Sequence, residues 1–210
     1  VQNRFDLSND LFVTAAVRVD GNSAFGINYG FQVYPKADVA YNLPVSSIPV
    51  VSSAKLRAAI GMAGKAPGAF ASFQTYSPNT VLEDLAGVRP SNPGNADLEP
   101  ENKVEREFGL DLGLFNDRVA IISTYYKAET QNALLGIALP PSEGFSSSML
   151  RNVGKIVNQG FEFQFNATAL DVGFMRWQTG FNYEWNENKI LDLGETAYAD
   201  SIPVYAANME

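Results

Sequence analysis

The sequence contains no cysteine and no histidine. Without cysteine, thiolate catalysis and disulfide bonds are excluded. Without histidine, so are imidazole-based catalytic triads, His-ligated zinc sites and near-neutral histidine switches. These two absences remove many enzyme classes. The lack of thiols does not fix the compartment, because such a chain is compatible with both reducing and oxidising surroundings.

Basic residues and long hydrophobic runs are also scarce. Fifteen Lys and Arg stand against 23 Asp and Glu, which gives a formal net charge of -8. No basic surface is therefore expected that would neutralise a phosphate backbone, and nucleic acid is not an expected partner. The best apolar run, residues 133–139, is interrupted by Gly136 and is far shorter than the roughly 18 residues of a membrane helix, so helical spanning is excluded.

The 210 residues are 46% hydrophobic and 18% charged, which predicts a folded chain rather than a disordered tail. We find no domain boundary and no tandem repeat. The chain starts at Val1 without an initiator Met or a signal-peptide pattern, and it stops at Glu210 without a closing element. We therefore expect a fragment, and the missing signal peptide says nothing about localisation.

Period-two alternation of apolar and polar residues predicts β-strands, and no segment convincingly predicts a helix. The predicted strands number about seven and cover residues 11–20, 31–43, 55–65, 104–115, 119–126, 161–169 and 176–186. The facing of 119–126 cannot be assigned, and Arg106 falls on the apolar parity of its strand, where its long side chain can snorkel. Most of these strands exceed the roughly 5 to 6 residues of soluble sheets and approach the 9 to 11 of tilted membrane strands.

The predicted connections alternate in length. Residues 116–117 and 171–174 are tight turns, whereas 66–102 and 133–156 are long and rich in Gly, Pro, Ser and Asn, and the segment after residue 190 also looks long. The connections at 21–30 and 44–54 are similar in length, so the asymmetry is weaker there. Short turns on one side and long loops on the other are typical of outer-membrane barrels.

Aromatic spacing offers a check on a membrane setting. Trp177 and Trp185 are eight residues apart on one face, or about 26 Å along a strand at roughly 3.3 Å per residue. A tilt of about 40° reduces this to about 20 Å, comparable with the apolar band of about 25 Å in such barrels. The alternative is a soluble β-sandwich whose inner faces carry the same aromatic residues.

Six short segments carry motifs that are weak singly but specific in their shared order and spacing. They are residues 18–26 (RVDGNSAFG), 56–64 (LRAAIGMAG), 95–109 with its LEPE at 98–101, 114–118 (LFNDR), 125–130 (YYKAET) and 152–162 (NVGKIVNQGFE). In this order the segments resemble the β-barrel of the SusC-like (RagA-type) branch of TonB-dependent outer-membrane transporters, which import glycans and peptides.

The resemblance implies an all-β fold, an antiparallel transmembrane β-barrel segment of about seven strands from a roughly 22-stranded plugged barrel. Residues 1–210 would belong to the barrel domain, with the plug, the segment that meets TonB and the closing strands outside this chain. It implies import across a Gram-negative-type outer membrane, with an oligosaccharide or oligopeptide ligand captured between the extracellular loops and a SusD-like lipoprotein, and TonB acting through the plug. Outer-membrane lipid would surround the barrel. No enzymatic activity, cofactor or metal is expected.

Two groups of residues are candidates for the substrate path. Polar positions that the alternation places toward a lumen are Glu162, Gln164, Asn166, Asn182 and Glu184, and aromatic residues in the longest loop are Phe70, Phe73 and Tyr76. Structural roles compete with both. We favour for Glu162 a hydrogen bond to neighbouring strands or to the plug, and for the three rings packing of the loop onto itself, rather than stacking on sugars or peptide side chains.

Other acidic groups have simpler interpretations. Glu105, Glu107 and Asp111 share a strand face and suggest a carboxylate pair for glycoside hydrolysis, but a plain acidic row is far more common. Residues 97, 99 and 101 are acidic without the spacing of a calcium loop. The LEPE segment is expected to fix the return of the loop to the barrel, because Pro100 presets its backbone angle. Two other functions stay open, a soluble β-sandwich carbohydrate-binding module and a passive porin or adhesin barrel.

Overall fold

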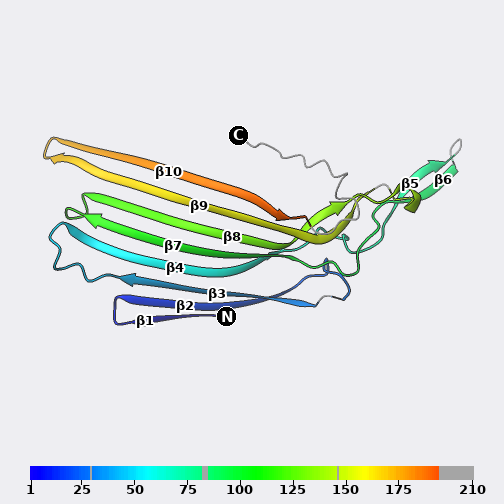
Figure 1. Cartoon of the computed structure of the whole chain (residues 1–210), viewed down its shortest axis with the longest axis horizontal. Coiled ribbons are helices and arrows are strands. Elements are labelled where there is room, and N and C mark those ends of the chain that lie inside the picture. The colour runs from blue at the N-terminus through cyan, green and yellow to red at the C-terminus, as the bar shows by residue number, and fades with distance from the viewer. Residues whose placement is uncertain (29, 82–84, 146, 194–210) are drawn as a thin grey trace.

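The computed structural model describes residues 1–28, 30–81, 85–145 and 147–193. Its main feature is one antiparallel sheet of eight strands in the order β1-β2-β3-β4-β7-β8-β9-β10 (Figure 1). These strands are β1 (Gln2–Leu7), β2 (Leu11–Gly21), β3 (Phe31–Asn42), β4 (Val51–Lys65), β7 (Glu101–Leu114), β8 (Val119–Ile137), β9 (Met149–Val172) and β10 (Met175–Asp192). A separate hairpin of β5 (Tyr76–Val81) and β6 (Leu85–Pro90) and a short 3-10 helix, η1 (Pro141–Glu143), complete the described structure.

The connections differ between the two ends of the sheet, as the sequence predicted. Residues 8–10, 43–50, 115–118 and 173–174 join strands at the end drawn on the left of Figure 1. Residues 22–30, 66–100 and 138–148 join them at the other end, from which the β5–β6 hairpin extends away from the sheet. We call these the turn end and the loop end.

All seven predicted strands are present, but the sequence missed β1, β5 and β6. The expectation of a long loop over 133–156 is wrong. β8 continues to Ile137 and β9 begins at Met149, because the two segments pair with each other after register shifts at Gln131 and Ala133. Cross-strand pairing satisfies the backbone groups there despite a Gly- and Asn-rich sequence. The expectation for the segment after residue 190 concerns mainly residues 194–210, which lie outside the described residues.

Most apolar positions of the eight strands fall on one face of the sheet, which we call the apolar face. One row of directly paired residues crosses the whole sheet, namely Phe5, Val13, Val39, Ala58, Phe108, Tyr125, Phe161 and Trp185. The facing of β8, which the sequence left open, follows from this register. Tyr125 lies on the apolar face, and Ile122 lies on the opposite face, which is why the alternation was ambiguous.

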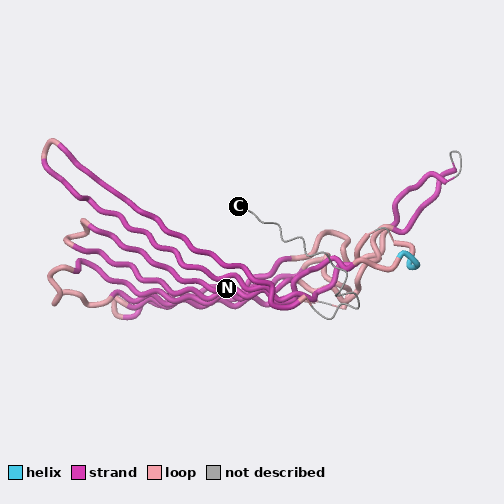
Figure 2. The backbone as a smooth tube through the Cα atoms, turned by 45° about the horizontal axis from the view of Figure 1, so that its top comes forward, coloured by secondary structure: helices cyan, strands magenta, loops and turns pink. Residues whose placement is uncertain are grey.

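The sheet forms a single layer, which Figure 2 shows along most of its length. Phe108 is 59% exposed and Trp185 is 42% exposed, so no second sheet of the described residues covers the apolar face. The described residues therefore do not form a β-sandwich, and the expectation of an all-β, antiparallel fold is confirmed. β1 and β10 are the two edges of the sheet, as expected for a piece of a barrel. Among the described residues, no helix is long and apolar enough to cross a membrane.

The buried side chains gather at the loop end. Leu98 is fully buried, Pro100 is almost fully buried, and Phe25 and Ala133 are only 5% and 2% exposed. We call this cluster, formed by residues 24–26, 95–101, 132–134 and 152, the Leu98 junction. The backbone N–H of Gly26 donates to the carbonyl oxygen of Leu98 at 2.8 Å. A Cβ at position 26 would collide with the carbonyl oxygen of Ala96, so this close approach requires glycine.

Asn152 ties the junction to the sheet. Its side-chain oxygen accepts from the backbone N–H of Glu99 at 2.8 Å, and its Nδ2 donates to the carbonyl oxygens of Glu99 and Asn132 at 2.7 and 3.1 Å. The Glu101 carboxylate accepts from the backbone N–H of Leu134 at 2.9 Å. β7 then starts at Glu101, directly after Pro100, which agrees with the expected role of LEPE in returning the loop to the sheet.

Leu98→Ala is expected to lower the unfolding free energy of the whole protein by about 2 to 5 kcal/mol, because it leaves a cavity at a fully buried site. Equilibrium denaturation measures the loss. Leu85→Ala, at a side chain that is 66% exposed, is the matched control. Equal losses in the two variants would contradict the central role of the junction.

Candidate functional site

The face opposite the apolar face, which we call the polar face, carries the five predicted polar residues together. Glu162 pairs directly with Glu184, Gln164 with Asn182, and Asn166 with Gly180. None of the five makes a side-chain hydrogen bond or ion pair with another described residue, so the expected hydrogen bond from Glu162 to a neighbouring strand is not observed. Their polar atoms are therefore open to contacts beyond the described residues.

Four of these residues, all except Asn166, line one shallow pocket on the polar face. Its lining includes Ile122, Thr124, Glu162, Gln164 and Glu184. The two carboxylates stand directly opposite each other across β9 and β10, where like charges repel. The pocket is therefore suited to hydrogen-bond donors or a cationic group from a ligand or another part of the protein.

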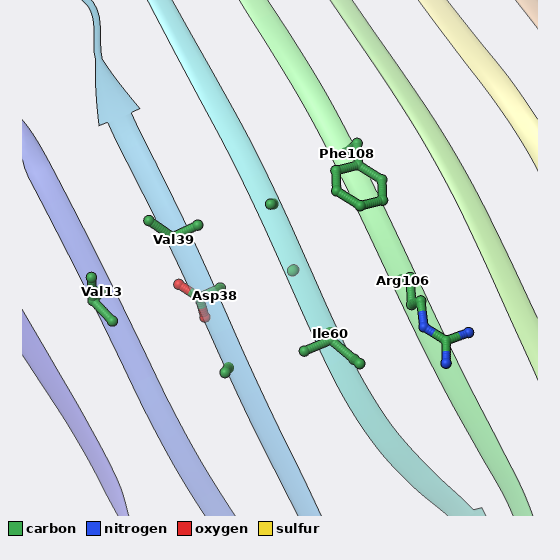
Figure 3. Close-up of a pocket in the computed structure, with 9 residues that line it drawn as sticks. Val13, Asp38, Val39, Ile60, Arg106 and Phe108 are labelled. Atoms are coloured by element: carbon green, nitrogen blue, oxygen red, sulfur yellow. The ribbon is translucent and has the colours of Figure 1, made fainter.

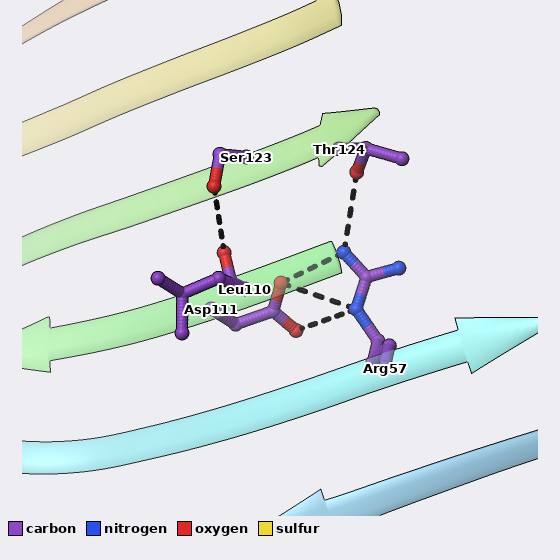
Figure 4. Close-up of polar contacts among 5 residues, drawn as sticks. All are labelled: Arg57, Leu110, Asp111, Ser123 and Thr124. Atoms are coloured by element: carbon purple, nitrogen blue, oxygen red, sulfur yellow. Dashed lines mark hydrogen bonds and ion pairs between the residues drawn. The ribbon is translucent and has the colours of Figure 1, made fainter. Parts of the chain in front are cut away.

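Beside this pocket, Arg57 crosses three strands (Figure 4). Its guanidinium donates to the Asp111 carboxylate, with Nη2 at 2.8 Å from Oδ1 and Nε at 3.0 Å from Oδ2, and Nη2 lies 3.4 Å from Thr124 Oγ1. Arg57 comes from β4, Asp111 from β7 and Thr124 from β8. The guanidinium occupies the space where Gly109 has no side chain, since a Cβ there would lie 2.6 Å from Nη2. Arg57 therefore joins neighbouring strands and is not free to neutralise Glu162.

The acidic row makes contacts within the sheet, including one between the Glu105 and Glu107 carboxylates. Glu105, Glu107 and Asp111 do share the polar face, as predicted. However, Asp111 is held by Arg57, and Glu105 pairs with Lys103 at 2.6 Å. Two of the three carboxylates are thus engaged with cations rather than placed as an acid and a base around a substrate.

Gly160 shows a second contact that the sequence did not predict. The Tyr126 hydroxyl occupies the place of a Cβ at Gly160, and Asn186 Nδ2 donates to that hydroxyl at 2.6 Å. Glycine is required at position 160 because the Tyr126 side chain lies close to its backbone. Its backbone angle is not in the left-handed region, so conformational freedom is not the reason. Strand glycines such as Gly109 and Gly160 signal that a neighbouring side chain crosses them, and that signal could have located both contacts.

The loop aromatics lie at the loop end, apart from the five polar residues. Phe70, Phe73 and Tyr76 are 69%, 52% and 58% exposed, so the expected packing of these rings onto the loop is not observed. The backbone instead is fixed by Asn92, whose Nδ2 donates to the carbonyl oxygens of Phe70 and Phe73 at 3.2 and 2.9 Å. The loop backbone is thus held in place while its aromatic rings remain exposed.

The acidic residues of the Leu98 junction point to different partners. Asp97 accepts from Asn28 at 2.8 Å, Glu99 from Asn132 at 2.9 Å, and Glu101 from the backbone of Leu134. Within the described part of the chain, no group of three or more acidic side chains is arranged to hold a metal ion. These carboxylates serve the junction.

Known proteins resemble this chain over nearly its whole length. The profile of the family described as "TonB dependent receptor-like, beta-barrel" matches residues 1–209. The TonB-dependent receptor P39 of Formosa agariphila is 29% identical over 91% of this chain and 19% of that protein. The TonB-dependent receptor SusC of Bacteroides thetaiotaomicron is 26% identical over 90% of this chain and 20% of that protein. The chain thus spans about a fifth of the length of these relatives.

Solved structures share the fold. The structure titled "Structure of the RagAB peptide transporter" superposes with a TM-score of 0.84 at 23% identity, over 92% of this chain and 22% of that one. The siderophore receptor PirA from Pseudomonas aeruginosa superposes with a TM-score of 0.61 at 19% identity, over 90% of this chain and 34% of that one.

A double-mutant cycle tests the bridge on the polar face. We expect Arg57→Gln and Asp111→Asn to couple by about 1 to 2 kcal/mol in unfolding free energy, because the pair is half-buried and bidentate. The exposed pair Arg176–Asp171 is the control and should couple by less than about 0.5 kcal/mol. Equal coupling in the two cycles would show that the Arg57 bridge adds nothing beyond a surface ion pair.

Proposed function

Because the chain belongs to the TonB-dependent receptor-like β-barrel family, we propose that it forms part of the barrel wall and extracellular loops of an outer-membrane importer. The main observation that supports this proposal is the apolar face, which runs across all eight strands of a single-layer sheet. A face of this kind requires a cover, and lipid acyl chains provide it in a barrel. The importer has no enzymatic role.

The aromatic residues support a membrane setting. The row Phe108, Tyr125, Phe161 and Trp185 crosses four strands, and Trp177 lies at the other end of β10 near the tight turn. Aromatic girdles flank the apolar band of outer-membrane barrels on both sides, with long loops outside the cell and short turns in the periplasm. On this assignment the loop end is extracellular.

The division of the whole protein follows from the proposed barrel. Residues 1–210 form part of its barrel domain, while the plug and the remaining strands belong to the rest of the protein. The unpaired edges of β1 and β10 support this arrangement, because an open edge requires a neighbouring strand. TonB acts on the importer through the plug.

The polar face then lines the lumen. Glu162, Gln164, Asn166, Asn182 and Glu184 stand there without partners among the described residues, which suits contact with the plug or with a passing ligand. Four of them line one pocket and Asn166 lines a neighbouring one, which supports this placement. The contact is polar, and the directly opposed carboxylates favour donors or cations.

We propose an oligosaccharide or an oligopeptide as cargo, captured between the extracellular loops and a SusD-like surface lipoprotein. Support comes from the names of SusC and of the RagAB peptide transporter among similar proteins. The exposed rings Phe70, Phe73 and Tyr76 on their pinned loop suit stacking on sugar rings or on apolar peptide side chains. A passive porin or adhesin is the competing function, and it would not need TonB.

The membrane setting predicts how the isolated chain behaves. Residues 1–210 expressed without detergent should aggregate, because the sheet has two open edges and an uncovered apolar face. Size-exclusion chromatography and circular dichroism check this. A compact, β-rich, soluble monomer would contradict the barrel segment.

Ligand binding by the whole protein tests the proposed role of the three loop rings. Phe70→Ala, Phe73→Ala and Tyr76→Ala combined should weaken ligand binding by at least about tenfold, because three stacking contacts of about 0.5 to 1.5 kcal/mol each are lost. Calorimetry with separate oligosaccharide and oligopeptide pools measures the loss and identifies the cargo class.

The matched control is Leu85→Ala with Val88→Ala, at exposed positions of the neighbouring hairpin. Unchanged affinity in the triple variant would remove the rings from the ligand path. Uptake that continues in cells without TonB would instead support a passive porin.

A further inference from the structure

Two unmatched cations stand on the apolar face where its aromatic row ends. Two residues further along the strands toward the loop end, and on the same face, the next row of directly paired residues is Arg106, Lys127, Gln159 and Glu187. Arg106 and Lys127 are therefore immediate neighbours across β7 and β8, an arrangement in which like charges repel. Neither makes an ion pair or a side-chain hydrogen bond with a described residue.

The acidic residues nearby already have closer cationic partners, and Arg106 acts on the Glu129 carboxylate only more weakly than Lys155 does. Glu129 pairs with Lys155 at 2.9 Å, and Glu187 pairs with Lys189 at 2.5 Å and accepts from Gln159 at 2.9 Å. The opposed pair thus keeps its positive charge in a chain whose net charge is -8. An anion between Arg106 and Lys127 would turn their repulsion into two attractive contacts.

An apolar depression adjoins the cations. Val13, Val39, Ile60 and Phe108 line it, and small side chains at 37 and 58 leave it shallow and open. Figure 3 shows Arg106 on the same strand as Phe108, next to Ile60 and at the margin of the depression. A ligand that fits both parts carries an anionic group joined to an apolar chain.

We propose that Arg106 and Lys127 bind a phosphate of an anionic lipid in the outer leaflet of the outer membrane, with an acyl chain of that lipid in the depression. This inference rests on the proposed function, since it needs the apolar face to meet a membrane with the loop end outside. Long basic side chains snorkel from apolar surface toward headgroups, and aromatic rings mark the same depth. A free phosphate would not use the depression, so the structure favours a lipid.

The test uses the whole protein, purified in a neutral detergent and titrated with a phosphorylated glycolipid of the outer leaflet. Thermal unfolding follows binding through the rise in midpoint temperature. The variant combining Arg106→Gln and Lys127→Gln should need about tenfold more lipid for half of that rise, because two charge-assisted contacts are lost. Lys103→Gln, on the polar face and paired with Glu105, is the matched control and should behave as the unmodified protein.

Three results would overturn the proposal. They are an equal lipid requirement in the double variant, an equal rise with the dephosphorylated glycolipid, and the same rise with inorganic phosphate alone, which would indicate a site for free anions. Membrane fractionation and ligand-uptake assays in the same cells distinguish failure of the lipid site from failure of the proposed importer function. A protein absent from the outer membrane defeats the importer, whereas a correctly located, active protein without lipid discrimination defeats only this inference.

Discussion

A sheet of one layer has no core beneath it, and this constraint governs the rest of the structure. Its backbone hydrogen bonds must be satisfied by neighbouring strands, and its side chains alternate between two environments along every strand. A slip of one residue at any pairing would move a whole strand's apolar set to the polar face. The register instead stays in phase from β1 to β10, and the shifts occur toward the ends of strands, near Val51, Ala133, Trp177 and Ile190. The continuous row from Phe5 to Trp185 is the visible result.

The Leu98 junction preserves the strand register across the longest connection in the sheet. Between β4 and β7 the chain leaves the sheet for residues 66–100 and must return beside the strand that it left. Burial of Leu98 and the reciprocal bonds between Asn152 and Glu99 fix the point of return, so that Glu101 enters the sheet opposite Lys65. The same anchoring lets the remainder of the excursion present exposed rings on a defined base. The Leu98 junction therefore both fixes the base of the loop and leaves the rings further along it exposed.

The sequence predicted what a single strand can reveal and missed what arises between strands. Alternation located seven strands, their two faces and the five polar residues around Glu162, because parity is a property of each segment alone. It missed β1 and the β5–β6 hairpin, whose sequences lack clear alternation, and the paired ends of β8 and β9, whose Gly and Asn resemble a loop. The bridge from Arg57 to Asp111 and the Tyr126 contact at Gly160 depend on register, which no single strand contains. The backbone of Phe70 is likewise held by Asn92, more than twenty residues away in the chain.

The two faces share one electrostatic feature with opposite signs. Several charges in the sheet are matched close by, as in Arg57 with Asp111 and Lys155 with Glu129. At two places, like charges stand directly opposite without a described partner, Glu162 with Glu184 on the polar face and Arg106 with Lys127 on the apolar face. Such pairs weaken an isolated sheet, so nothing within the sheet explains them. In the proposed importer, each pair would meet a neighbour of the opposite charge, on the lumen side for the acids and on the lipid side for the cations. On that proposal, these like-charged pairs mark where the sheet would contact other molecules.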